Sequence, residues 1–337
     1  MKIAWLCLQG LGDALMATPA IAALRRAQPS AEIHVVTLGA APDTLFGALP
    51  LVDTVHALPF WEKNVPAIIS GLIRLRSLRF DASILAYPSV RREYHFVARA
   101  IGARTRISHA YEPFSKTFCF LETERIPIEN EHNVLNNARL LAPLGVEIDA
   151  STLGGYAAPP SWQSTQGRTN EIAFHVGTMT YKGNENKRWP LERFIQTAQL
   201  LEKSGHPIAF ICGPLEREVT ERAIQSVRIA RKIEGPIDHV AREISRMRVV
   251  ITADNGIAHV SAAVRTPVIT LFGLTDPGKC GPWGEDVHIV RPSDCPPCFD
   301  FGDATFHCKR QIDFRCLQKD LQVEHVLSAL KLVDVVV

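Results

Sequence analysis

No apolar stretch of this sequence is long enough to span a membrane as a helix. A spanning helix needs about 20 consecutive apolar residues, whereas the longest apolar runs, such as residues 264–274, are interrupted by Arg or Pro. The apolar run at the amino terminus ends at Gly10, too early for a signal peptide, and no small-residue cleavage site follows it. We therefore expect a cytoplasmic protein.

An excess of one charge is also missing. The net charge is only +2, which argues against a general nucleic-acid-binding protein. Residues 71–106 differ from the rest, because they contain eight Arg but only Asp81 and Glu93 as acidic residues. This stretch is either a solvated helical face or a docking face for an anionic acceptor or for headgroups at the cytoplasmic face of the inner membrane.

The sequence has no dinucleotide-binding motif. Gly10 and Gly12 follow the first apolar run, but Leu15 stands where such a motif has a third glycine or alanine. No acidic residue marks a ribose site at the end of the second predicted strand. We therefore expect no NAD.

The rest of the chain alternates short apolar runs with longer amphipathic ones. Strands that are apolar on both faces and alternate with helices predict parallel sheets that are covered on both sides. The predicted strands are 3–8, 33–37, 54–58, 82–86, 172–176, 208–212, 249–252 and 268–272. The predicted helices are Thr18-Pro19 to about Gln28, 67–78, 94–101, 132–144, 191–203, 216–226, 257–264 and 323–332.

A length of 337 residues favours two domains over one. Eleven of the twenty residues 151–170 are Gly, Ser, Thr or Pro, a composition typical of a linker. We predict an α/β protein with Rossmann-like domains at 1–155 and 171–337, joined by a linker at 156–170. Ligands of doubly wound folds bind at the carboxyl ends of the strands, so we expect a nucleotide cleft where the two domains face each other.

Three motifs stand between predicted strands and helices. Gly10-Leu11-Gly12-Asp13 follows the first strand, and Asp13 is equally consistent with a helix cap and a catalytic carboxylate. Asn186-Lys187-Arg188-Trp189-Pro190 places two cations before a helix, which suits a diphosphate or leaves two solvated charges in a loop. The turn 254–259, which holds Asp254-Asn255-Gly256 and His259, is either a capped turn or a cradle for a sugar phosphate.

Four of the eight cysteines crowd into one segment, 295–316. A close pair with two further thiols supplies four ligands for a tetrahedral zinc or iron ion. The residues between them show no helix or strand period, as in a loop held by a metal. The alternative is four reduced, unconnected thiols. The expected structural Zn or Fe ligands are Cys295, Cys298, Cys308 and Cys316.

Taken together, these motifs resemble those of the ADP-heptose lipopolysaccharide heptosyltransferases of glycosyltransferase family nine. Leu11-Gly12-Asp13, Lys187-Arg188-Trp189-Pro190, Asp254-Asn255-Gly256 with His259, and Leu271-Phe272-Gly273 occur in the expected order over nearly the whole chain. The stretch 178–187 is longer than in the core-oligosaccharide enzymes. Asn255 replaces a more common Thr or Ser. Both departures concern the donor site.

The resemblance implies the GT-B architecture and inversion of the anomeric centre in one displacement without a catalytic metal, in keeping with the absence of any Asp-x-Asp motif. Asp13 would be the general base. Within the donor site, Thr178 and Lys187 would contact the diphosphate and Glu216 the nucleoside. The full donor-binding set that we expect is Thr178, Lys187, Arg188, Glu216, Asp254, Asn255, Gly256 and His259.

The expected reaction is transfer of heptose from ADP-heptose to a lipopolysaccharide core sugar. The acceptor is anionic and lipid-linked, or it is a protein hydroxyl, as in an autotransporter heptosyltransferase. A sugar-nucleotide epimerase of similar fold and a catalytically inactive sugar-nucleotide-binding protein are the alternatives. An inactive relative would have no reason to keep both Asp13 and Lys187.

Overall fold

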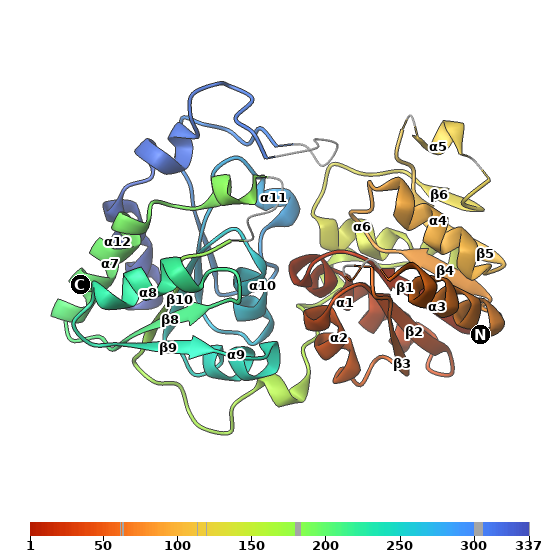
Figure 1. Cartoon of the computed structure of the whole chain (residues 1–337), viewed down its shortest axis with the longest axis horizontal. Coiled ribbons are helices and arrows are strands. Elements are labelled where there is room, and N and C mark those ends of the chain that lie inside the picture. The colour runs from red at the N-terminus through yellow and green to blue at the C-terminus, as the bar shows by residue number, and fades with distance from the viewer. Residues whose placement is uncertain are drawn as a thin grey trace. The chain divides into compact units, whose positions relative to one another are not determined.

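The computed structural model describes residues 1–336 apart from 61, 63, 113, 119, 179–182 and 300–305. Cys119 and parts of the predicted 178–187 and 295–316 segments therefore lie outside the described residues. The chain forms two compact units, Met1–Pro160 and Ser161–Val337 (Figure 1). No helix in the described ranges is both long and apolar enough to cross a bilayer.

The first unit contains a parallel sheet of six strands in the order β3-β2-β1-β4-β5-β6. Its strands are β1 (Lys2–Cys7), β2 (Glu32–Thr37), β3 (Thr54–Ala57), β4 (Ala82–Leu85), β5 (Thr105–His109) and β6 (Glu124–Ile126). Its α-helices are α1 (Leu11–Ala27), α2 (Ala40–Gly47), α3 (Val65–Ser77), α4 (Arg92–Ile101), α5 (Phe114–Thr117) and α6 (Asn133–Arg139).

The second unit contains a parallel sheet in the order β12-β11-β10-β7-β8-β9. Its strands are β7 (Ile172–His175), β8 (Ile208–Cys212), β9 (Ala230–Glu234), β10 (Val249–Ala253), β11 (Val268–Leu271) and β12 (Val287–Val290). Its α-helices are α7 (Leu191–Lys203), α8 (Arg217–Gln225), α9 (Ile237–Ile244), α10 (Gly256–Ala263), α11 (Pro277–Cys280) and α12 (Val323–Leu330).

Both sheets have the same topology. Within each unit the chain moves outward from the first strand to the third and then returns to add the fourth strand beside the first. The strand order therefore reverses between β1 and β4 in one unit and between β7 and β10 in the other. Doubly wound folds bind ligands at such switch points, beyond the carboxyl ends of the strands. The prediction of parallel sheets covered by helices is confirmed.

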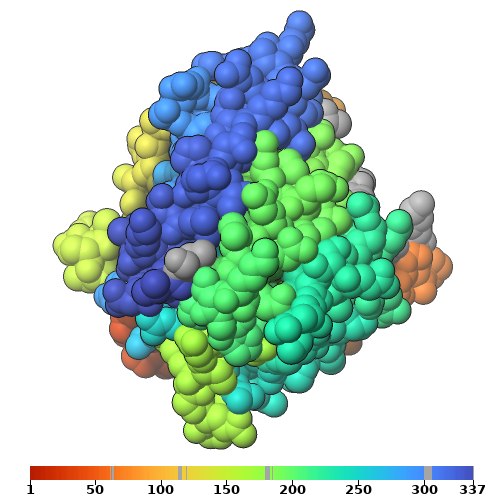
Figure 2. All heavy atoms as spheres, turned by 90° about the vertical axis from the view of Figure 1, so that its left-hand side faces the viewer, coloured from red at the N-terminus to blue at the C-terminus, as the bar shows by residue number. Residues whose placement is uncertain are grey.

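The core of the second unit is rich in aromatic side chains. Phe174 of β7 packs against Phe194 and Phe210, and Trp189 meets Phe194 edge to face at a centroid distance of 5.0 Å. The indole N–H of Trp189 donates to the Leu321 carbonyl at 2.8 Å, which ties the start of α7 to the carboxyl-terminal segment. Figure 2 shows this segment, in blue, lying beside the green segment that contains α7.

One predicted helix start is wrong. Thr18-Pro19 does not begin a helix, because α1 already begins at Leu11 and Pro19 lies inside it. Proline has no N–H for the carbonyl four residues before it, here that of Leu15. The buried Thr18 hydroxyl donates to that carbonyl at 2.7 Å and supplies the missing hydrogen bond. Thr18-Pro19 is therefore an interior feature of the helix.

The predicted helix 132–144 is two pieces, α6 and a 3-10 turn at Ala142–Leu144. Pro143 cannot donate to the carbonyl of Arg139, so α6 ends there. Gly145, with a φ of 73°, closes the turn.

Candidate active site

The predicted donor residues lie beyond the carboxyl ends of β7 and β10, at the switch point of the second unit. Lys187 Nζ donates to Asp254 Oδ2 at 3.0 Å, and the hydroxyl of Thr275 donates to the same oxygen at 2.8 Å. The Lys187 and Asp254 side chains are only 13% and 8% exposed. The structure thus brings together two predicted residues that are 67 positions apart in sequence.

Arg188 contacts Thr178. Its Nε atom donates to the Thr178 hydroxyl at 3.0 Å, and its Nη2 atom donates to the Thr178 carbonyl. Because Thr178 follows β7 and Arg188 precedes α7, this contact fixes the loop that carries Lys187 to the end of the central strand. The two neighbouring cations are thus held at different strand ends: Lys187 by Asp254, which follows β10, and Arg188 by Thr178, which follows β7.

Asn255 caps α10. Its side-chain oxygen accepts from the Ile257 N–H at 2.9 Å, and its amide nitrogen donates to the Gly177 carbonyl at 3.2 Å and to the Thr252 hydroxyl at 2.9 Å. Gly256 opens the helix, and His259 is buried on its second turn. The cap leaves the amino end of α10 beside Asp254, where a helix dipole favours negative charge.

Glu216, expected to contact the nucleoside, points inward. Its Oε2 atom lies 3.3 Å from Nε2 of His175, the last residue of β7. Burial works to raise the pKa of Glu216, but the hydrogen bond with His175 and the charges of His175 and Arg188 outweigh it, so this pKa lies below its usual value. Glu216 is therefore a partly buried carboxylate beside the donor motifs.

Two glycines make room for Glu216. A Cβ atom on Gly177 would lie 2.3 Å from Glu216 Cγ, and one on Gly213 would lie 2.1 Å from Glu216 Oε2. Any larger residue at either position would displace the carboxylate. His175 and these glycines were not among the predicted site residues, because nothing in their spacing links them to Glu216.

Asp13 lies in the other unit. It is in the first turn of α1, just beyond the carboxyl end of β1, and the helix N-cap is Gly10. Asp13 is therefore not the cap. Burial raises the pKa of the Cys7 thiol and of the Tyr111 hydroxyl, and the charge of Asp13 raises both further. The Asp13 carboxylate thus lies close to two buried groups that remain neutral.

A buried polar network supports the turn before Asp13. Gln9 Nε2 donates to the carbonyls of Ala86 at 3.1 Å and Pro88 at 2.7 Å, and to the Ser89 hydroxyl. Nε2 of His95 lies 2.8 Å from the Ser89 carbonyl, and Nδ1 of His95 pairs with Glu122. Sequence reasoning missed this network, whose members are far apart in the chain and form no motif.

The four clustered cysteines differ in their surroundings. Burial and the neighbouring thiol of Cys295 raise the pKa of Cys316 to about 12, and Cys298 adds a smaller effect. Burial works to raise the pKa of Cys308, but backbone N–H groups, with Ile312 N 3.4 Å from its sulfur, lower it. Among the described residues, no group of three or more His, Cys, Asp or Glu side chains is arranged to hold a metal ion.

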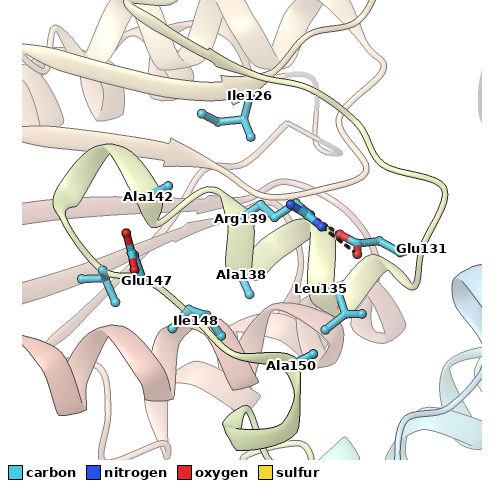
Figure 3. Close-up of a pocket in the computed structure, with 10 residues that line it drawn as sticks. Ile126, Glu131, Leu135, Ala138, Arg139, Ala142, Glu147, Ile148 and Ala150 are labelled. Atoms are coloured by element: carbon cyan, nitrogen blue, oxygen red, sulfur yellow. Dashed lines mark hydrogen bonds and ion pairs between the residues drawn. The ribbon is translucent and has the colours of Figure 1, made fainter.

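A pocket of about 410 Å³ lies in the first unit (Figure 3). Within it the Arg139 and Glu131 side chains point toward each other and form an ion pair. None of the predicted site residues lines the pocket. Its lining residues are Ile126, Glu131, Leu135, Ala138, Arg139, Ala142, Val146, Glu147, Ile148 and Ala150.

Comparison with known proteins agrees with the motifs. Lipopolysaccharide heptosyltransferase 1 of Escherichia coli K12 is 26% identical over 321 residues, which cover 86% of this chain and 93% of that protein. Lipopolysaccharide heptosyltransferase 3 of Escherichia coli is 22% identical over 294 residues, with coverage of 82% and 84%.

The solved structure of Escherichia coli heptosyltransferase WaaC with ADP-2-deoxy-2-fluoro heptose has the same fold. Its TM-score is 0.76 at 19% identity, and the match covers 98% of this chain and 99% of that one. The predicted GT-B fold is therefore confirmed. The model of glycosyltransferase family 9 (heptosyltransferase) matches residues 73–308, more than half of the sequence. The chain belongs to glycosyltransferase family 9, and it is a glycosyltransferase.

Proposed function

We propose that this protein transfers heptose from ADP-heptose to an acceptor hydroxyl, with inversion at the anomeric carbon. The observation that carries the proposal is the buried Lys187–Asp254 pair at the switch point between β7 and β10. A largely buried ammonium beside the amino end of α10 suits the diphosphate of a nucleotide sugar. The curated relatives are named as lipopolysaccharide heptosyltransferases, which supports heptose as the sugar.

The second unit would bind the donor. Lys187, Arg188 and the hydroxyl of Thr178 would contact the diphosphate, while Asp254, Asn255, Gly256 and His259 would hold the sugar and its phosphates. Glu216 would bind the nucleoside. As the bond between the anomeric carbon and the diphosphate oxygen breaks, its electrons stay on ADP, and the two cations and the helix dipole stabilise the added charge. Protein groups thereby do what a metal ion does in other transferases.

The first unit would bind the acceptor. Asp13 would take the proton of the acceptor hydroxyl as its oxygen attacks the anomeric carbon from the face opposite to ADP. A positioned carboxylate contributes about 100- to 10,000-fold in such a role. The network from Gln9 to Glu122 would keep the preceding turn in place, because its hydrogen bonds fix the loop after β1 to the loop after β4.

We propose a lipopolysaccharide core sugar as the acceptor in preference to a protein hydroxyl, because one face of α3 suits an anionic lipid surface. Val65, Ile69 and Ile73 lie four residues apart and are 59%, 52% and 65% exposed. Arg74 and Arg76 stand in the last turn of the same helix. An apolar stripe next to cations is typical of helices that lie on the inner-membrane surface.

The double variant Ile69→Ser with Ile73→Ser should reduce cosedimentation of the protein with anionic vesicles. The control, Ile229→Ser with Leu332→Ser, changes two other exposed apolar residues and should not reduce it.

We also propose that Cys295, Cys298, Cys308 and Cys316 hold a structural zinc or iron ion. Burial and the nearby thiols of Cys295 and Cys298 raise the pKa of Cys316, which indicates that these three side chains lie near one another. The backbone N–H groups around Cys308 favour its thiolate, the form that binds metal. A solved dodecameric heptosyltransferase, TibC, is described as iron-containing and has a similar fold, with a TM-score of 0.59. The metal would tie down an irregular loop and take no part in transfer.

Binding of a nucleotide panel separates this proposal from an epimerase or an inactive binding protein. We expect ADP and ADP-heptose to bind, UDP-N-acetylglucosamine to bind far more weakly, and ADP to be released from ADP-heptose only when a lipid acceptor extract is added. Preference for the uridine nucleotide would favour the epimerase. Tight binding of ADP-heptose without ADP release would favour the inactive binder.

A further inference from the structure

The ring of Phe306, on the cysteine-rich segment, covers the Lys187 ammonium. Lys187 Nζ lies 5.0 Å from the centre of this ring. The carbonyl of Phe306 also accepts a hydrogen bond from Asn186 Nδ2 at 2.9 Å. A Cβ atom on Gly183 would lie 2.7 Å from that carbonyl oxygen, so the two segments are in close contact. Phe306 therefore touches the donor loop through both its ring and its backbone.

Phe306 is itself held in place. Its ring stacks on Phe299 with a centroid distance of 4.2 Å and an interplanar angle of 19°. The backbone N–H groups of Cys298 and Phe299 donate to the Leu274 carbonyl at 2.8 and 2.9 Å. Leu274 immediately precedes Thr275, whose hydroxyl binds Asp254. The aromatic stack and the anion that pairs with Lys187 are thus fixed to the same short segment after β11.

We propose that Phe306 is a positioning residue for the donor diphosphate, acting through Lys187. The inference rests on the proposed function, because it takes Lys187 to be a phosphate ligand. The ammonium has two neighbours of different kinds: Asp254 neutralises it, and the Phe306 ring attracts it by a cation–π contact. A diphosphate that reaches this ammonium competes with the carboxylate and not with the ring.

The ring matters because the site is largely out of water. A lysine this buried loses part of its favourable hydration energy. The negative face of an aromatic ring compensates for part of this loss, and it leaves the other sides of the ammonium open to an anion. A leucine at position 306 fills similar space but has no such face. The ammonium would then be held by Asp254 alone, and ADP would have to compete for it more strongly.

The test compares Phe306→Leu with Phe306→Tyr, which keeps the ring. We expect Phe306→Leu to weaken ADP binding by about 3- to 30-fold, the range that cation–π contacts give. Adenosine, which has no diphosphate, should bind equally well to both variants, and Phe306→Tyr should keep ADP affinity within about twofold. Phe120→Leu, an exposed phenylalanine of the other unit, is the matched control and should change neither. Equal loss of ADP and adenosine binding, or no loss in Phe306→Leu, would overturn the inference.

A double-mutant cycle tests whether the effect passes through Lys187. The background is Lys187→Met with Asp254→Asn, which removes both charges of the pair and leaves none buried alone. In this background Phe306→Leu should have no further effect on ADP affinity, and a persisting loss would overturn the inference. If the background itself binds ADP as tightly as the native protein, the phosphate-site assignment fails, and the proposed function fails with it.

Discussion

Glu216 Oε2 lies 3.3 Å from His175 Nε2, and the carboxylate fits there because residues 177 and 213 are both glycine. A methyl group at either glycine would occupy the position of the Glu216 side chain. The donor end of the second unit therefore contains the inward carboxylate of Glu216 in addition to the Lys187–Asp254 pair.

The first prediction concerns this fit. Gly177→Ala should destabilise the protein by about 1–3 kcal/mol, because the added methyl group forces Glu216 out of its place. In a Glu216→Ala background the same substitution should cost much less, since the obstructing side chain is gone. Thermal or denaturant unfolding of the four proteins measures the coupling. An equal cost of Gly177→Ala in both backgrounds would show that Glu216 does not occupy this space.

The second prediction concerns Asp13. Asp13→Asn should lower kcat by at least about 100-fold, because the amide cannot take the acceptor proton. The dissociation constant of ADP should be unchanged, since Asp13 belongs to the acceptor unit. Steady-state kinetics and calorimetry give the two values. Near-native turnover in the variant would remove Asp13 from the role of general base.

The third prediction concerns pH. Nε2 of His56 lies 2.8 Å from Nδ1 of His34. Burial, with the charges of His34 and Arg74, lowers the pKa of His56 to about 4. In the unfolded chain His56 has its ordinary pKa near 6.5. The unfolded state therefore binds the proton more readily, so the stability contributed by neutral His56 is present above about pH 6.5 and is lost as the pH falls toward 4.

His56→Gln removes this titration. Between about pH 6.5 and 4 the native protein should lose stability more steeply than the variant. Melting temperatures across this range provide the comparison. Parallel curves for the two proteins would mean that His56 is not neutral in the folded state.

The fourth prediction concerns the cysteine-rich segment. The purified protein should contain about one zinc or iron ion per chain, since four thiols are the usual set for a structural site. Replacing Cys295 and Cys298 together by Ser should lower the melting temperature, because binding free energy of the metal becomes folding free energy of that loop. The control is the pair Cys7→Ser and Cys212→Ser, which should leave the metal content unchanged. Less than about a tenth of an equivalent of metal, with all four thiols reactive in the folded protein, contradicts this prediction.

The central elements of the fold could be predicted because buried strands carry a strong signal. The predicted boundaries of α7 and β8 are those of the structure, Leu191–Lys203 and Ile208–Cys212. Four strands were missed. Three of them, β6, β9 and β12, lie at sheet edges, where one side of the backbone has no neighbouring strand. The fourth, β5, lies between β4 and β6, but Arg106 interrupts its short apolar run. Lys232 and Glu234 in β9 form ion pairs at the surface. These charged residues interrupt the apolar pattern by which a strand is recognised in the sequence.

The site could be predicted only where its residues form local motifs. Lys187 and Asp254 each stand next to a helix start, and this marks them in the sequence. Phe306 and His175 carry no such mark. Their roles depend on contacts with residues that are distant in the sequence: Phe306 contacts Lys187, and His175 contacts Glu216. Only the fold brings these side chains together.

The most direct test of the account is transfer of labelled heptose from ADP-heptose to lipopolysaccharide that lacks the inner-core heptoses, measured in EDTA. The native protein should release one ADP for each heptose attached, and the new linkage should have the inverted anomeric configuration. Lys187→Ala should bind both ADP and ADP-heptose more weakly, by about 1–3 kcal/mol for a lost charge-assisted contact. Three results would contradict the account: no transfer to a lipid acceptor, retention of the anomeric configuration, or an ADP dissociation constant that is unchanged in Lys187→Ala.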